Sequence, residues 1–86
     1  METYPSDKKI TLKYFSSLAE EVKKSSEEYR TSAQTAEELW QELSERYGLQ
    51  QQKNHIRPSI NHQFCEWQSV IKDLDVVSFI PPVSGG

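Results

Sequence analysis

Apolar and polar residues alternate along residues 9–14. Ile10, Leu12 and Tyr14 are separated by polar residues, and a period of two is typical of a strand with one buried face. Phe15 closes the segment. We therefore expect an opening strand whose apolar side chains face the core.

Two later segments have the spacing of amphipathic helices, and the first is short. Ser17 and Glu20 are three residues apart, like the partners of a capping box. Leu18 and Val22 would bury one face of the helix behind them. The pattern ends in polar residues 23–26, where we expect a turn.

The second helical segment is longer and more regular. Thr35 and Glu38 form another capping-box pair, and Gly48 is a natural residue to end a helix. The apolar residues between these limits recur at helical spacing: Ala36, Leu39, Trp40, Leu43 and Tyr47. We expect this helix to be the main helical element of the core, with Trp40 buried in it.

The remaining segments predict strands and turns. Residues 28–32 form a plausible second strand, and strand signals return over residues 56–67, where Pro58 requires an edge position or a strand start. Residues 72–75 form a turn. Residues 76–80 are nearly all apolar, as in a central strand flanked on both sides. The order predicts an α+β fold, a small mixed sheet with helices packed on one face.

Composition excludes several classes of function. The chain has 86 residues and a formal charge of −3, so it forms one small domain without the basic face of a nucleic-acid-binding protein. No apolar run approaches the roughly 20 residues of a membrane span, and the N-terminus lacks the features of a secretory signal. The single cysteine, Cys65, rules out an internal disulfide. We expect a cytoplasmic protein that binds neither nucleic acid nor membrane.

The last six residues are the most informative part of the sequence. They hold two of the three glycines and two of the four prolines: Pro81, Pro82, Val83, Ser84, Gly85 and Gly86. The prolines favour an extended exit from the last strand, and the glycines, which have no Cβ, can enter a narrow channel. We therefore expect a flexible leader over residues 1–7, a domain over residues 8–80, and a tail over residues 81–86. The tail would insert into a partner's active site.

The reacting group would be the terminal carboxylate of Gly86. A carboxylate is anionic at neutral pH and a poor electrophile. A partner must therefore first convert it to an acyl-adenylate with ATP. A sulfur nucleophile would then give a thiocarboxylate, and an amine would give an amide.

This tail closely resembles that of the small, sulfur-carrying subunit of molybdopterin synthase, the MoaD family, which has the ubiquitin-like β-grasp fold. Residues 10–15, which end in Tyr-Phe, resemble the opening strand of the family. Residues 35–48 resemble its long second helix, and residues 60–64 resemble a later strand. The resemblance covers about residues 8–86.

The resemblance implies a mechanism. An enzyme similar to ubiquitin-activating enzymes would adenylate Gly86 with ATP, and a sulfur donor protein would then supply the sulfur of a thiocarboxylate. The tail would enter the large subunit of molybdopterin synthase and donate sulfur to cyclic pyranopterin monophosphate, in molybdenum cofactor biosynthesis. In this family the catalytic lysines belong to the large subunit. The chain would be a co-substrate with no cofactor of its own, within a heterotetramer.

We expect the partner to contact the end of the last strand and the tail. One of Phe79 and Ile80 should lie in the core, and the other on an apolar docking patch around the tail exit. The candidate partner-binding residues are Phe15, Phe64, Phe79, Ile80, Pro81, Pro82, Val83, Ser84, Gly85 and Gly86.

Other residues have simpler interpretations. His55 and His62 lack a third ligand at metal spacing, so no metal site is expected, and Cys65 is expected to be buried. Leu74 stands in a turn where the MoaD family commonly has glycine, which leaves the turn geometry open. The polar linker over residues 50–55 is long for the family.

Three other functions stay open. The chain could carry sulfur for another pathway, such as thiamine synthesis or tRNA thiolation. It could be a protein modifier in which Gly86 becomes joined to a lysine amine. It could also be a plain interaction domain whose tail is incidental.

Overall fold

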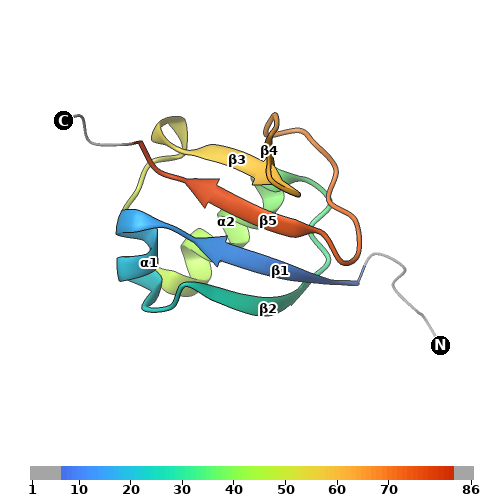
Figure 1. Ribbon diagram of the computed structural model, residues 1–86, viewed down its shortest axis with the longest axis horizontal. Coiled ribbons are helices and arrows are strands. Elements are labelled where there is room, and N and C mark those ends of the chain that lie inside the picture. The colour runs from blue at the N-terminus through green and yellow to red at the C-terminus, as the bar shows by residue number, and fades with distance from the viewer. Residues whose placement is uncertain (1–6, 83–86) are drawn as a thin grey trace.

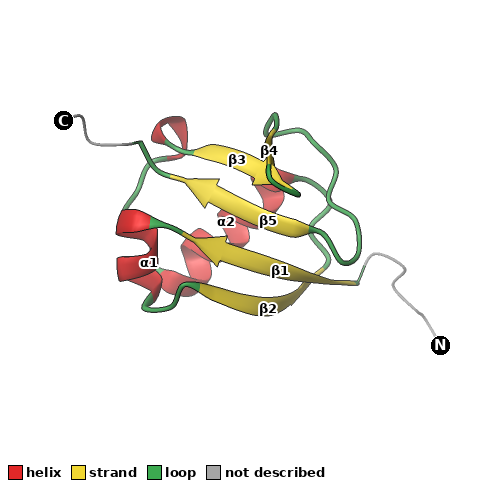
Figure 2. Ribbon diagram, in the orientation of Figure 1, coloured by secondary structure: helices red, strands yellow, loops and turns green. Residues whose placement is uncertain are grey.

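The computed structural model describes residues 7–82. Its elements, in chain order, are β1 (Lys8–Tyr14), α1 (Ser16–Val22), β2 (Ser26–Thr31), α2 (Ala36–Tyr47), a short 3₁₀ helix (Lys53–His55), β3 (Arg57–Ile60), β4 (Gln63–Phe64) and β5 (Val76–Ile80). The five strands form one sheet in the order β2-β1-β5-β3-β4. Figures 1 and 2 show α2 crossing behind this sheet, with α1 beside it.

The sheet is mixed, and its last strand is central. β1 and β5 run parallel, and every other pair is antiparallel. The predicted α+β architecture is confirmed, and so is the central position of β5. Because β5 has hydrogen-bonded neighbours on both sides, its end at Ile80 is held firmly where the chain leaves the sheet.

The alternation in β1 decides which face of the sheet is covered. Ile10, Leu12 and Tyr14 are buried, whereas the residues between them are half-buried on the opposite face. The core cluster draws on both helices, through Leu18 of α1 and Leu43 of α2 among others. The opposite face carries no helix in the described part of the chain (Figure 2).

The predicted capping box at the start of α1 is wrong. The helix begins at Ser16, Phe15 is its N-cap residue, and no side chain caps it. The backbone carbonyl of Phe15 accepts bonds from the N–H groups of Leu18 and Ala19 instead. The chain turns immediately after β1 because Tyr14 and Leu18 must both reach the core, which leaves Ser17 inside the first turn.

The predictions for α2 are confirmed, with one change of partner. Thr35 accepts a hydrogen bond from the N–H of Glu38, and Gly48 ends the helix with a φ of 62°. The carboxylate of Glu38 accepts a bond from the N–H of Gln34, not from Thr35. The apolar stripe, Trp40 included, faces the sheet, and only Tyr47 at its end is half-buried.

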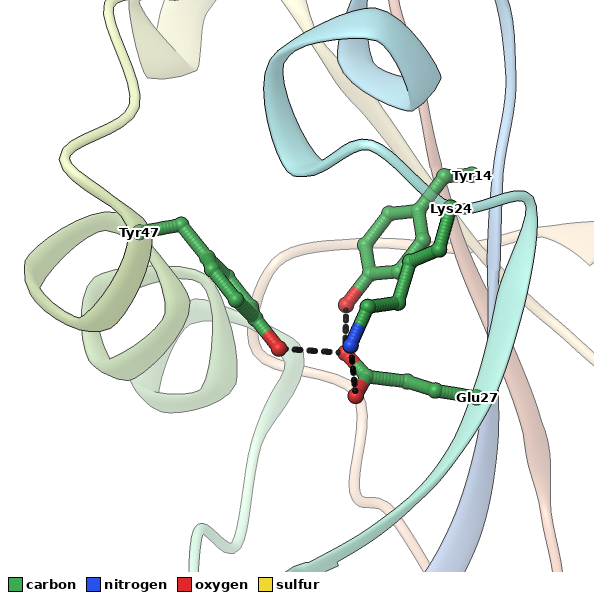
Figure 3. Close-up of polar contacts among 4 residues, drawn as sticks. All are labelled: Tyr14, Lys24, Glu27 and Tyr47. Carbon is green, nitrogen blue, oxygen red and sulfur yellow. Dashed lines mark hydrogen bonds and ion pairs between the residues drawn. The ribbon is translucent and has the colours of Figure 1, made fainter.

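Two carboxylates fasten β2 to α2. Glu27 accepts hydrogen bonds from Tyr14 (2.6 Å) and Tyr47 (2.8 Å) and pairs with Lys24 (3.1 Å), as Figure 3 shows. Glu42 on α2 accepts bonds in the same way from two β2 hydroxyl groups, those of Tyr29 and Thr31, each at 2.7 Å. The hydroxyl groups at the edge of the core are thereby satisfied.

The turn before β5 contains a strained residue. Leu74 has a φ of 72° and is 73% exposed, and the N–H of Asp75 bonds to the carbonyl of Lys72. This geometry is that of a type II turn, which favours glycine at the position of Leu74. The N–H of Leu74 donates to the carbonyl of Lys9 at 2.8 Å, and this bond to β1 holds the turn in place.

The remaining predictions concern residues 50–67. Pro58 is the second residue of β3, an inner strand, so it marks a strand start and not a sheet edge. The linker docks on α1, because Gln51 donates to Ser17 (2.7 Å) and Glu21 (3.1 Å). Cys65 is half-buried, not buried as predicted. Among residues 7–82, no helix is long and apolar enough to cross a membrane.

Candidate docking surface at the tail exit

Small residues lie at the centre of the helix-free face of the sheet. The register pairs Ser78 of β5 with Ser59 of β3, and Ser59 with Phe64 of β4. Because Val77 and Phe79 point into the core, Ser78 points to the opposite face. The short serine side chains leave a hollow of about 220 Å³, lined by Phe15, Ser59, His62, Phe64, Ser78 and Ile80.

A second hollow continues toward the end of the last strand. It has a volume of about 450 Å³ and is lined by Asn54, His55, Arg57, Phe64, Ile80, Pro81 and Pro82. Phe64 and Ile80 line both hollows. We call the two together the tail-exit groove. It runs along the helix-free face to the point where the tail begins.

The two residues at the end of β5 have different environments. Phe79 is 1% exposed and packs against Trp40 and Trp67, with ring centroids 5.2 Å and 5.9 Å away. Ile80 is half-buried and forms a wall of the tail-exit groove. The expectation of one residue in the core and one on the outer surface is therefore met. Phe79 supports the surface from below and offers no side chain to a partner.

The aromatic candidates Phe15 and Phe64 lie on the groove. They are 45% and 55% exposed, which is unusual for phenylalanine. The guanidinium group of Arg57 lies over the ring of Phe64 at 4.1 Å from its centroid. This contact orients both side chains at the rim of the groove.

The tail is described only at its first two residues. Pro81 is buried and Pro82 is exposed, and both line the groove. The other predicted tail residues, Val83, Ser84, Gly85 and Gly86, lie outside the described residues, as do residues 1–6 of the leader. Every predicted partner-binding residue within residues 7–82, apart from the buried Phe79, lines this one surface.

Sequence reasoning missed Arg57, Ser59, His62 and Ser78. Ser78 had a usable signal, because a serine between two buried residues of a central strand must point away from the core. Ser59 and Arg57 had none, because their position depends on the pairing of β3 with β5. His62 enters the groove through the turn after β3, where Asn61 and His62 both have positive φ.

The fold and this surface define a class of protein. A five-stranded mixed sheet with two helices on one face and the last strand at its centre is characteristic of ubiquitin-like β-grasp proteins. The chain belongs to the ThiS family, whose model matches residues 12–86. It is therefore a small ubiquitin-like protein of the sulfur-carrier type.

Solved structures show the same fold. SAMP1 from Haloferax volcanii has a TM-score of 0.74 and 19% identity, over 91% of this chain and 99% of that one. A putative molybdopterin converting factor subunit 1 from Pyrococcus furiosus has a TM-score of 0.74 and 22% identity, over 88% and 99%. In the complex of subunits 1 and 2 of molybdopterin-converting factor from Helicobacter pylori, a chain has 26% identity and a TM-score of 0.63, over 91% and 99%. No curated protein matches the sequence significantly.

Proposed function

We propose that this chain is the small, sulfur-carrying subunit of a molybdopterin synthase, with Gly86 carrying sulfur as a thiocarboxylate. The observation that carries the proposal is the position of the tail-exit groove. The central strand ends at Ile80 in the wall of the groove and continues directly into Pro81 and Pro82. A partner that covers the groove would receive the residues that follow. The likeness to one chain of the Helicobacter pylori two-subunit complex supports this pathway.

The chemistry starts at the Gly86 carboxylate. One of its oxygens attacks the α-phosphorus of ATP on an adenylating enzyme, and pyrophosphate leaves. A sulfide equivalent (HS⁻), supplied by a donor protein, then attacks the acyl carbon, and AMP leaves with the electron pair of the broken carbon–oxygen bond, which gives a thiocarboxylic acid that loses its proton. The thiocarboxylate sulfur then attacks a carbon of the pterin substrate and displaces an oxygen leaving group. Water finally cleaves the acyl–sulfur bond, which leaves the sulfur on the substrate and restores the Gly86 carboxylate.

In this proposal, this chain docks on the large subunit and supplies the sulfur at Gly86. The tail-exit groove offers an apolar surface with Phe15, Phe64 and Ile80 at its walls, which suits a protein partner. The large synthase subunit would bind there and supply the pterin pocket and the catalytic groups. The adenylating enzyme must read the same end of the chain earlier in the cycle.

The proposal is tested by the intact mass of the chain after incubation with the adenylating enzyme, ATP and a sulfur source. We expect a gain of about 16 Da at Gly86, because sulfur replaces oxygen. A variant that lacks Gly86 should fold normally and gain no mass. An unchanged mass, with an enzyme that is competent on another carrier, would contradict the proposal.

The partner decides which sulfur pathway the chain serves. A mass gain at Gly86, without co-purification of a large synthase subunit, would move the function to another sulfur pathway such as thiamine synthesis or tRNA thiolation.

A protein modifier is the second candidate, since small archaeal modifier protein 1 has this fold. In that case Gly86 would form an amide with a lysine of a target protein. Conjugates that survive a denaturing gel and disappear in the variant without Gly86 would support it.

A further inference from the structure

We infer that Arg57 binds a carboxylate of the partner that covers the tail-exit groove. The large subunit would then have an aspartate or glutamate opposite this guanidinium. The inference rests on the proposed function for the identity of the partner. It adds a charged recognition element to a groove whose walls include Phe15, Phe64 and Ile80.

Arg57 lies at the point where the chain leaves the sheet. It is the first residue of β3, and its register partner is Ile80 at the end of β5. β3 and β5 lie side by side in Figure 1. Arg57 lines the same hollow as Pro81 and Pro82. A partner that receives the tail therefore has to pass over this guanidinium.

The guanidinium is held in place but its charge is not matched. Its central carbon lies over the Phe64 ring, and a guanidinium beside an aromatic ring still has N–H donors available for a carboxylate. Within residues 7–82, no carboxylate pairs with Arg57, and none lines either hollow of the groove. An arginine that is oriented beforehand loses less entropy when it forms a two-pronged bond to a carboxylate.

Two other cations of the sheet form ion pairs within the chain. Lys9 pairs with Glu28, and Arg30 pairs with Asp7 at 3.5 Å. Lys13 is the second cation without an ion pair in the described part of this face. It lies beside Ser78, the floor of the groove, by register. The unmatched positive charges of the face thus flank the groove, although the chain carries a net charge of −3.

This charge pattern selects the chemistry of the partner. An acidic residue on the partner would be attracted to Arg57 and partly desolvated by the apolar walls beside it, which strengthens the pair. A partner with a cation at that position would be repelled. Arg57 is therefore a specificity residue of the docking surface and takes no part in the chemistry at Gly86.

The test measures binding of the full chain to the large synthase subunit from the same genome, by titration calorimetry at two salt concentrations. Arg57→Gln should weaken binding by about tenfold or more and reduce its salt dependence. Arg57→Glu should bind more weakly still, because two negative charges then meet. Arg57→Lys should have an affinity between those of the wild type and Arg57→Gln, because lysine keeps the charge but cannot form the bidentate hydrogen bonds of a guanidinium.

Arg30→Gln is the matched control, because Arg30 lies on the same face but is paired within the chain. It should bind within about twofold of the wild type. Thermal unfolding should confirm that all four variants fold. Equal affinities for Arg57→Gln and the wild type, or for Arg57→Gln and Arg57→Glu, would overturn the inference while leaving the proposed function intact. Failure of the wild type itself to bind the large subunit would overturn both, and the mass gain at Gly86 would then show whether the carrier chemistry survives.

Discussion

The two faces of the sheet differ in how their side chains are satisfied. On the face covered by α2, apolar residues such as Leu12 and Phe79 are almost fully buried. At the edge of that face, carboxylates such as Glu27 accept hydrogen bonds from tyrosine hydroxyl groups. On the helix-free face, Phe15 and Phe64 stay exposed around two hollows. The buried side chains on one face thus stabilise the fold, and the other face offers a partly apolar groove. β5 contributes residues to both faces.

The strongest test of this comparison uses one substitution at two sites. Phe79→Ala removes a buried ring and should cost about 3–5 kcal/mol of unfolding free energy, because a cavity remains. Phe64→Ala removes an exposed ring and should cost less than about 1 kcal/mol. Chemical denaturation measures both values. Similar losses for the two variants would contradict the division between the faces.

For partner affinity we expect the opposite order, with the larger loss in Phe64→Ala. Phe64→Ala should weaken affinity for the partner by about tenfold, since exposed aromatic residues dominate docking surfaces. A folded fraction of Phe79→Ala should bind nearly as well as the wild type, because its ring offers no contact surface.

Glu27, at the edge of the core, should contribute less to stability than Phe79. Glu27→Ala should cost about 2 kcal/mol at neutral pH, because Tyr14 and Tyr47 both lose their acceptor. Glu28→Ala, at an exposed neighbour that pairs with Lys9, should cost less than about 0.5 kcal/mol. Urea unfolding of both variants at neutral pH measures the difference, and an equal cost would show that the hydroxyl groups find other acceptors.

The pH dependence of the Glu27 contribution has a defined sign. Burial alone would raise the pKa of Glu27, but the hydrogen bonds from Tyr14, Tyr47 and Lys24 outweigh it and hold the pKa below its ordinary value of 4.5. A lowered pKa in the folded state stabilises the protein above the unfolded pKa. The difference between the wild type and Glu27→Ala should therefore narrow as the pH falls below about 4.5 and through the folded pKa.

Filling the groove should separate docking from folding. Ser78→Val adds volume to the floor of the hollow, in a central strand that accepts branched residues well. We expect unfolding free energy to change by less than about 1 kcal/mol and partner affinity to fall by about tenfold. Thr11→Val, on the same face but outside the groove, is the control. Undiminished binding by Ser78→Val would show that the partner docks elsewhere.

The smallest expected effect is a gain in stability at the turn before β5. Leu74→Gly should raise the unfolding free energy by about 0.5–1 kcal/mol, because glycine adopts a φ of 72° without strain and the exposed leucine has little packing to lose. Val70→Gly is the matched control, since Val70 is 62% exposed but does not have positive φ. It should lower stability. A loss in both variants would mean that the Leu74 side chain contributes to the fold.

Local pattern predicted a large part of the fold. The alternation in β1, the apolar stripe of α2 and the glycine at its end were sufficient, because each depends on neighbours within a few residues along the chain. The start of α1 was misjudged for the opposite reason. The capping-box spacing was present, but the burial of Tyr14 and Leu18 on either side moved the helix start to Ser16.

The sequence by itself determined the family, because the family model matches residues 12–86, and it predicted the central last strand, because residues 76–80 are nearly all apolar. It also predicted which residues lie around the tail exit. Only the tertiary structure decided that Ile80 faces the groove and Phe79 the core, that Ser59 meets Ser78, and that Arg57 stacks on Phe64 beside the tail. The physical reason is strand pairing. A period of two separates the faces of one strand, but the register between strands distant in sequence decides which side chains become neighbours.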